Sequence, residues 1–165
     1  MDATHLHLIL THVPIVGTLF GTAILAYGLY ANNTDLKKTA VVTFILMALL
    51  TIPVFLTGSA AEETVETIPG VTENLIENHE EWAEKALWGI GFLGVLAIIT
   101  GYAILKTRAF AKTMSVITLI VSLGTFGLFA KVGNEGGKIR HSEIRTTNLN
   151  NATNLFNSDD DGDDD

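Results

Sequence analysis

Residues 39–57 read TAVVTFILMALLTIPVFLT and contain no charged side chain. At about 1.5 Å per residue, a helix of this length crosses the roughly 30 Å hydrocarbon core of a lipid bilayer. Three further apolar stretches lie at residues 6–30, 86–105 and 113–130, and no internal repeat is evident among the four. The sequence therefore predicts an all-α fold, a four-helix transmembrane bundle whose main partner is the lipid bilayer.

The composition agrees with a membrane-embedded chain. Of the 165 residues, 48% are hydrophobic and only 17% are charged, a balance that water-soluble domains seldom show. We expect one transmembrane domain over residues 1–145 and a disordered acidic tail over residues 146–165, because the tail is polar and lacks apolar periodicity. Cysteine is absent, which excludes disulfides, iron–sulfur clusters and a thiol nucleophile. A bound metal or haem must then use His, Met, carboxylate or backbone oxygen ligands.

The distribution of cations predicts how the bundle is oriented, because short cytoplasmic loops of membrane proteins are enriched in Lys and Arg. The predicted loops after the first and third spans carry Lys37, Lys38, Lys106, Arg108 and Lys112. The connection over residues 58–85 is rich in Glu instead. We therefore expect this connection and both termini on the extracytoplasmic side of a bacterial inner membrane, although the cations that follow the fourth span oppose this orientation.

Glycines recur in three of the predicted spans, where a missing side chain lets helix backbones approach closely. They could serve packing within one bundle, or alternatively a seam between two copies of the chain. The positions concerned are Gly17, Gly21, Gly91, Gly94, Gly101, Gly124 and Gly127.

Three of the five histidines lie at the start of the first span. His12 lies inside the apolar run, where an ionisable side chain is costly unless it faces the bundle interior and finds a partner, so it is a candidate functional residue. His5 and His12 share one helix face, and His7 is rotated away from both. The alternative for His5 and His7 is that they are polar residues at the membrane interface.

The other two histidines are predicted on the same side of the membrane. His79 precedes the third span in a segment that reads as an extension of that helix, and it shares a face with Trp82, Ala83 and Ala86. This face is expected to enter the bundle and bring His79 toward His12; the alternative is a solvated residue at a helix start. His141 follows the fourth span.

Acidic residues beside these histidines allow a metal site. Glu62, Glu63 and Glu66 directly follow the second span, and carboxylate with imidazole suits zinc, iron or manganese. The alternative is a solvated acidic loop. A hydrolytic metal centre would need three protein ligands and an open water position, which His12, His79, His141 and Glu62 could supply.

Four short motifs resemble a family of bacterial four-helix membrane proteins that is catalogued mainly as a domain of unknown function. Relatives of this kind can be joined to Rieske iron–sulfur or cytochrome c modules, so the resemblance implies a role in extracytoplasmic electron transfer and bound haem b. At the last motif the family pattern has Tyr where His141 stands here, and His where Glu143 stands. The motifs are Leu6-His7-x4-His12-x-Pro14-Ile15, Thr57-Gly58, His79, and Gly136-Gly137-Lys138-Ile139-Arg140-His141.

Three functions from different classes follow. The first is a b-type cytochrome-like electron-transfer subunit of a redox membrane complex, with His12 and His79 as the preferred haem ligands and His7 and His141 as further candidates. The second is a non-enzymatic scaffold or partner subunit that binds a transition metal or nothing. The third is a metal-dependent membrane hydrolase. The sequence contains no nucleotide-binding fingerprint or protease motif, and no nucleic-acid partner is expected.

Overall fold

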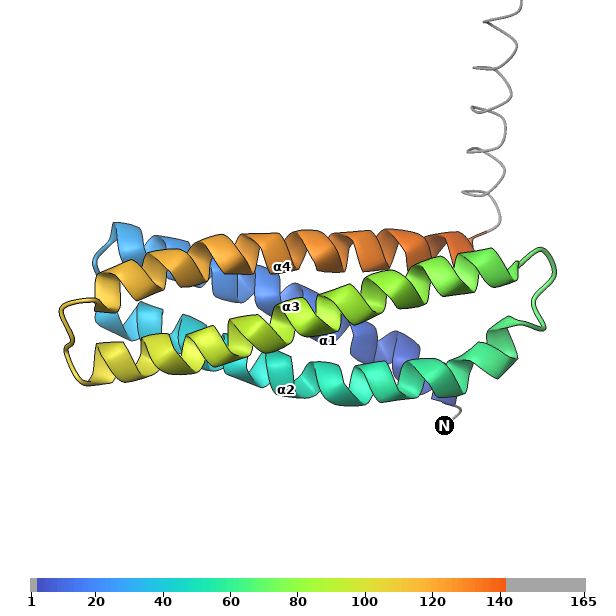
Figure 1. The fold of residues 1–165 in the computed structure, drawn as a ribbon, viewed down its shortest axis with the longest axis horizontal. Coiled ribbons are helices and arrows are strands. Elements are labelled where there is room, and N and C mark those ends of the chain that lie inside the picture. Colours follow the sequence, from blue (N-terminus) through green and yellow to red (C-terminus); the bar gives the residue numbers. More distant parts are fainter. Residues whose placement is uncertain (1–2, 142–165) are drawn as a thin grey trace, which may run out of the picture.

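The computed structural model describes residues 3–141, which form four long helices that run up and down in an antiparallel bundle (Figure 1). Each is long and apolar enough to cross a membrane, which confirms the predicted four-helix transmembrane fold class. The predicted acidic tail lies outside the described residues. The helices are α1 (Ala3–Tyr30), α2 (Thr34–Val65), α3 (Glu73–Leu105) and α4 (Ala111–Arg140).

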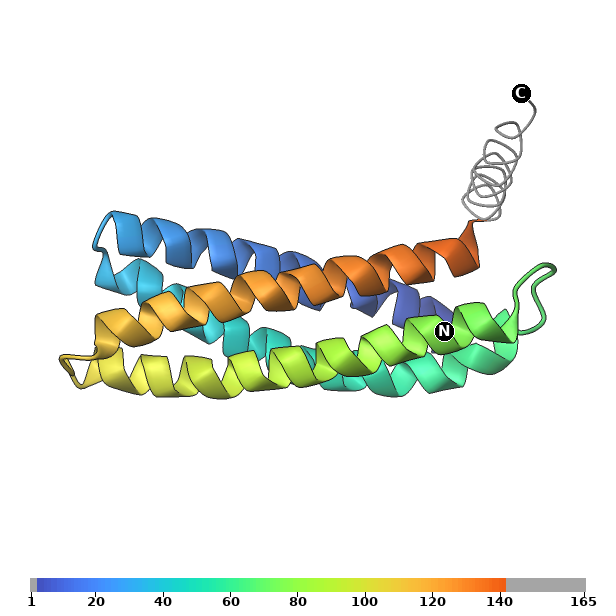
Figure 2. The ribbon, with the colours of Figure 1, turned by 45° about the horizontal axis from the view of Figure 1, so that its top comes forward.

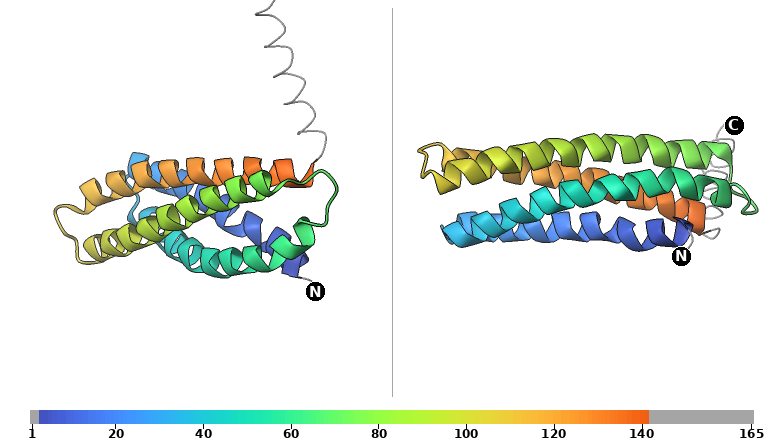
Figure 3. Two further views of the ribbon diagram at one scale, coloured as in Figure 1. Left: turned by 45° about the vertical axis from the view of Figure 1, so that its right-hand side comes forward. Right: turned by 90° about the horizontal axis from the view of Figure 1, so that it is seen from below.

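The two ends of the bundle hold different segments of the chain (Figure 3). One end, called here the loop end, holds the short connections 31–33 and 106–110. The other, called here the histidine end, holds the start of α1, the connection 66–72 and the end of α4. All five histidines belong to the segments at this end, as the threading of the sequence predicts.

The connections at the loop end are short, and residues within them cap the helix that follows. The side chain of Asn33 accepts hydrogen bonds from the backbone amides of Asp35 and Leu36 at 2.9 and 3.1 Å, which satisfies two of the unpaired N–H groups that begin α2. Asp35 adds a negative charge to the first turn, where the helix dipole favours it. Asn32 adopts a positive φ of 49°, a conformation that Asn tolerates better than most residues.

Much of the bundle interior is lined by small and polar side chains. The inward face of α1 includes Thr18, Gly21 and Gly28, and that of α4 includes Ser122 and Thr125. The Thr125 hydroxyl donates to the carbonyl of Val121 at 2.9 Å in its own helix, so its polarity is satisfied without water. Many large apolar side chains point outward, which suits a bundle surrounded by lipid.

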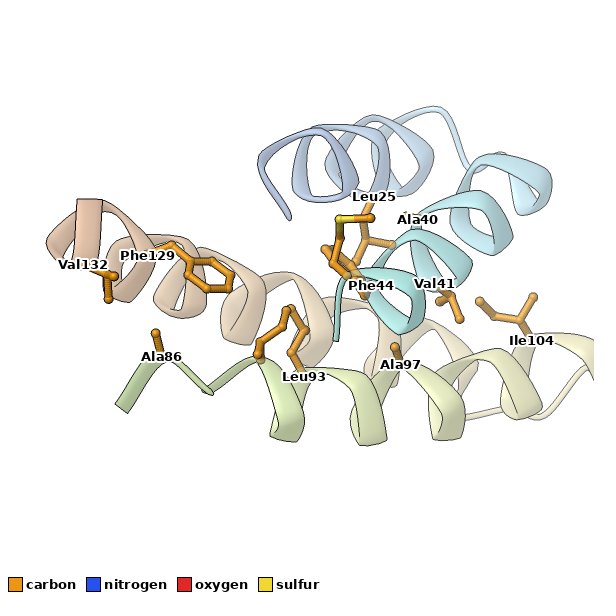
Figure 4. Packing of buried hydrophobic residues seen from close by; sticks show 12 residues of the cluster. Leu25, Ala40, Val41, Phe44, Ala86, Leu93, Ala97, Ile104, Phe129 and Val132 are labelled. Carbon is orange, nitrogen blue, oxygen red and sulfur yellow. The ribbon is translucent and has the colours of Figure 1, made fainter. Parts of the chain in front are cut away.

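The apolar part of the core joins all four helices and is drawn in Figure 4. Phe44 of α2 is fully buried and fills the space that Gly21 of α1 leaves, since a Cβ at position 21 would lie 2.7 Å from the ring. A Cβ at Gly94 of α3 would lie 2.7 Å from the Cβ of Ala48 on α2. The predicted role of these glycines in packing within the bundle is confirmed at both positions.

Substitution of Gly94 tests this close contact. Gly94→Ala is expected to lower the free energy of unfolding by ~1–3 kcal/mol, because neither Cβ can rotate away and the helices must separate. Gly91→Ala on the same helix is the control, since a Cβ there would meet no atom of another described helix within 4 Å. The measurement is unfolding of both variants by SDS titration in mixed micelles. Equal stabilities of the two variants would contradict the packing described.

The chain forms two helical hairpins, α1–α2 and α3–α4 (Figure 2), whose burial patterns repeat one another. When His7 is aligned with His79, the residues of α1 up to Tyr30 match those of α3 up to Tyr102 position by position as buried, half-buried or exposed. The single exception is Ile24, which is half-buried where α3 has a buried residue. The hairpins are therefore related by an approximate two-fold axis along the bundle, although few of their residues are identical.

The burial pattern of α2 also matches that of α4. With Val54 aligned to Val132, each buried position of α2 from Ala40 to Val54, apart from Val41, corresponds to a buried position of α4. In this alignment Val41 corresponds to Leu119, which is half-buried. The glycines four residues beyond the two valines, Gly58 and Gly136, are both half-buried.

Candidate functional site

The imidazole of His7 is held by α2. Its Nδ1–H donates to the carbonyl oxygen of Val54 at 3.0 Å, and the hydroxyl oxygen of Thr57 lies 3.3 Å from the same nitrogen. The ring lies over Gly58, where a Cβ would approach its Cε1 to 3.3 Å. Because the hydrogen bond to a carbonyl requires the proton on Nδ1, the neutral ring keeps a lone pair on Nε2, which is free to bind a metal or a haem iron.

The imidazole of His79 is held by α4 in a similar way. The ring lies over Gly136, where a Cβ would be 3.1 Å from its Cε1, and Val132 lies one turn before this glycine. Its Nδ1 is buried and has no partner within the geometric limits of a hydrogen bond among residues 3–141. A buried polar atom without a well-formed hydrogen bond is uncommon and often marks a site where another group binds.

The two histidines are equivalent under the approximate two-fold symmetry. Each lies on the first helix of a hairpin and rests on the second helix, above a Val-x-x-x-Gly sequence that places the carbonyl and the glycine one turn apart. We call each such sequence a histidine seat: Val54 to Gly58 for His7, and Val132 to Gly136 for His79. Helices α1 and α3 lie diagonally in the bundle, so the two seats lie at the same end of the bundle on different helix pairs.

A charged cluster distinguishes the two seats. The residue before the glycine is Thr57 in the first seat and Glu135 in the second. The Glu135 side chain is only 6% exposed and binds Lys131 at 2.6 Å and Lys138 at 2.8 Å. Lys131 also lies over the ring of Trp82, 5.4 Å from its centroid. Glu135 directly precedes Gly136, over which the ring of His79 lies, so the surroundings of His79 are more charged than those of His7.

His12 does not face the bundle interior, contrary to the expectation from the sequence. Its ring is exposed, and its Nδ1–H donates to the carbonyl of Leu8 in its own helix at 3.0 Å. His5 is exposed as well, whereas His7 is half-buried. The reason is helix register: the inward face of α1 runs through His7, Pro14 and Gly21, and position 12 lies on the opposite side. The histidine of α1 that turns toward the bundle is therefore His7 and not His12.

The face of α3 that was expected to enter the bundle does so. Ala86 belongs to the buried core, and Trp82 and Ala83 pack against it. The prediction that the third helix extends beyond its apolar span is also confirmed, because α3 begins at Glu73.

The metal-ligand set expected from the sequence is not assembled. Within the described part of the chain, no group of three or more His, Asp or Glu side chains is arranged to hold a metal ion. His141 is the exposed C-cap of α4, and Glu62 is half-buried on α2. The combination of His12, His79, His141 and Glu62 is therefore not supported, because His12 points away from the bundle.

A shallow groove of about 240 Å³ lies elsewhere, between α2 and α3. Its lining side chains are all apolar, and two of its lining residues are Gly91 and Gly94. An acyl chain or another helix could pack in this groove, but its lining residues contain no polar side chain that could bind or react with a ligand.

Sequence reasoning missed the two seats and the buried carboxylate of Glu135. The available signal was the recurrence of Val-x-x-x-Gly near the ends of the second and fourth helices, each paired with a histidine near the start of the preceding helix. The signal is weak, because valine and glycine are common in membrane helices.

Comparison with known proteins adds no relative: no family model, curated protein or solved structure matches the chain significantly. The structure by itself assigns the chain to a class, the multi-pass membrane proteins built as an antiparallel four-helix bundle.

Proposed function

We propose that this protein is a b-type cytochrome-like electron-transfer subunit that holds haem b between His7 and His79. The observation that carries the proposal is the matched pair of seats, which present imidazoles from two diagonal helices at the same end of the bundle. Two axial imidazoles from facing helices are a common way to bind haem in a four-helix bundle, and this chemistry requires no cysteine.

The residues present fit such a group. At His7 the backbone carbonyl of Val54 fixes the ring and its tautomer, an arrangement found at most metal-bound histidines. At His79 the buried Nδ1 has no well-formed hydrogen bond among the described residues. Gly58 and Gly136 remove the side chains that would push the rings away. The iron of a bound haem would supply one-electron chemistry, and the charge of Glu135 near His79 would contribute to its potential.

The proposed location is the extracytoplasmic face of a bacterial inner membrane. The loop end carries Lys37, Lys38, Lys106, Arg108 and Lys112, which favours a cytoplasmic position for that end. The histidine end would then face outward, where a redox complex could exchange electrons with the site. The resemblance of the histidine motifs to a family joined to Rieske and cytochrome c modules supports this placement.

The decisive experiment is the absorption spectrum of the full-length protein, purified from cells supplied with a haem precursor. We expect one haem b per chain and a Soret band that shifts on reduction with dithionite, with the sharp α band of a low-spin, two-imidazole iron. Colourless protein that takes up no added haem would overturn the proposal. A colourless protein with stoichiometric zinc or iron would favour the metal-dependent alternative, and one with neither would favour the scaffold.

A further inference from the structure

The helices are longer than a bilayer requires. They contain 28, 32, 33 and 30 residues, whereas about 20 cross the hydrocarbon core. Cations lie close to the ends of the helices at the loop end, as at Lys37 and Lys106, so little excess length is available there. The excess of roughly ten residues, or about 15 Å, therefore lies at the histidine end. Exposed Glu80, Glu81 and Lys85 on α3 agree, since such charges avoid hydrocarbon.

The two hairpins carry opposite surfaces in this protruding part. The two-fold symmetry aligns Glu80, Glu81 and Lys85 of α3 with apolar residues of α1 that are just as accessible. These are Leu8, Ile9 and Val13, which are 41%, 51% and 41% exposed. On the second helices it aligns the exposed Asn134 of α4 with Leu56 of α2, which is 67% exposed. At one height, the bundle is charged or polar on the α3–α4 side and apolar on the α1–α2 side.

We name the apolar surface at this height the apolar collar, and we propose that it is immersed in the adjacent lipid leaflet. The collar consists of Leu8, Ile9 and Val13 on α1 with Phe55 and Leu56 on α2. The bundle is then tilted, with the α1–α2 hairpin deeper in the membrane than the α3–α4 hairpin. Lipid covers the collar, and the equivalent surface of α3 and α4 stays in water.

Continuity of the surface identifies lipid as the occupant. The exposed apolar face of α1 runs without a charged residue from the collar through Val16 and Phe20 to Tyr27, which is the face that lipid covers in the span. The size of the tilt is reasonable as well. A height difference of about 10 Å across a bundle roughly 20 Å wide corresponds to about 25°, and membrane helices tilt by up to about 40°.

This position explains two features of the histidine end. His12 is exposed within the collar, and its Nδ1–H donates to the carbonyl of Leu8 in its own helix, which satisfies this donor where lipid covers the surface. In addition, the Nζ atoms of Lys85 and Lys131 lie 4.5 and 5.4 Å from the centroid of the Trp82 ring. Tryptophan and lysine side chains are both favoured in the headgroup zone of a membrane. For the haem site, and resting on the proposed function, a water-soluble redox partner would approach over α3 and α4.

The natural absence of cysteine makes the proposal directly testable. Single substitutions Leu8→Cys, Ile9→Cys and Leu56→Cys are compared with their symmetry equivalents Glu80→Cys, Glu81→Cys and Asn134→Cys. Each full-length variant is placed, one chain per disc, in nanodiscs of phosphatidylcholine and phosphatidylglycerol and labelled with a charged, membrane-impermeant maleimide. We expect at least tenfold slower labelling at each collar position than at its equivalent, and equal labelling of all variants in SDS.

A nitroxide attached at the same positions identifies what covers the collar. Immersion in lipid predicts relaxation by oxygen and little by a water-soluble nickel chelate at the collar, with the reverse at the equivalents. Equal labelling within each pair would overturn the tilt. Protection in native membranes that is lost in single-chain nanodiscs would overturn lipid as the occupant in favour of a protein. None of these readouts depends on haem, so they separate this proposal from the proposed function.

Discussion

Replacement of either seated histidine is expected to remove the bound haem. His7→Ala and His79→Ala each delete one axial ligand, so we expect at least a 100-fold loss of haem affinity, because losing even a group that only orients a ligand costs 10–100-fold. His12→Ala is the matched control: the ring is exposed and donates to the carbonyl of Leu8 in its own helix, so the haem affinity of this variant should stay within twofold of the wild-type value. The measurement is haem titration of purified apoprotein followed at the Soret band.

A second readout shows whether the variants remain folded. Helix content by circular dichroism should be unchanged in all three, because neither seated ring belongs to the apolar core. Haem retained by the His79 variant, or lost only in the His12 variant, would contradict the assignment of His7 and His79. Exogenous imidazole should restore haem binding to the alanine variants in part, a rescue that a purely structural role would not produce.

Filling the seat of His79 is expected to have an effect of similar size without touching the histidine. In Gly136→Val the new Cβ would lie 3.1 Å from the ring, and its two methyl groups extend the clash, so the imidazole must turn away. We expect haem affinity to fall by 10–100-fold, as for the loss of a group that orients a ligand. The spectrum of the residual haem should show the high-spin features of an iron that has lost one imidazole.

The neighbouring glycine supplies the control. Gly137→Val makes the same chemical change one residue further along α4, where a Cβ meets no atom of the described residues within 4 Å. Both variants should have similar helix content, and the Gly137 variant should bind haem normally. The same loss in both variants would mean that α4 is disturbed as a whole. Gly58→Val extends the test to the seat of His7 and should weaken binding too.

The architecture was predictable because it depends on summed properties of long segments. The apolar runs at residues 6–30 and 86–105 end at the same residues as α1 and α3 at the loop end, where cations follow closely. At the histidine end the helices continue beyond the predicted spans, because segments such as the one around Glu80 are helical and charged. Hydropathy identifies the residues that cross the hydrocarbon core, and it does not detect the part of a helix that continues into water.

The orientation of the histidines was not predictable in the same way. In a water-soluble helix the apolar residues mark the buried face, but here the buried face of α1 contains Thr18, Gly21 and Gly28 while Leu19 and Phe20 face outward. Hydropathy therefore could not decide whether His7 or His12 points inward. The separation of the two onto different faces was predicted from helix geometry and is confirmed.

By itself, the sequence determined four helices long enough to span a membrane and the location of every histidine at one end. These properties follow from chain length, hydropathy and the alternation of up and down helices. Only the tertiary structure decided that His7 rather than His12 turns toward the bundle, that the rings of His7 and His79 lie over Gly58 and Gly136, and that the hairpins repeat one another. Such facts depend on which turns of separate helices meet, and that is set by side-chain packing between segments far apart in the chain.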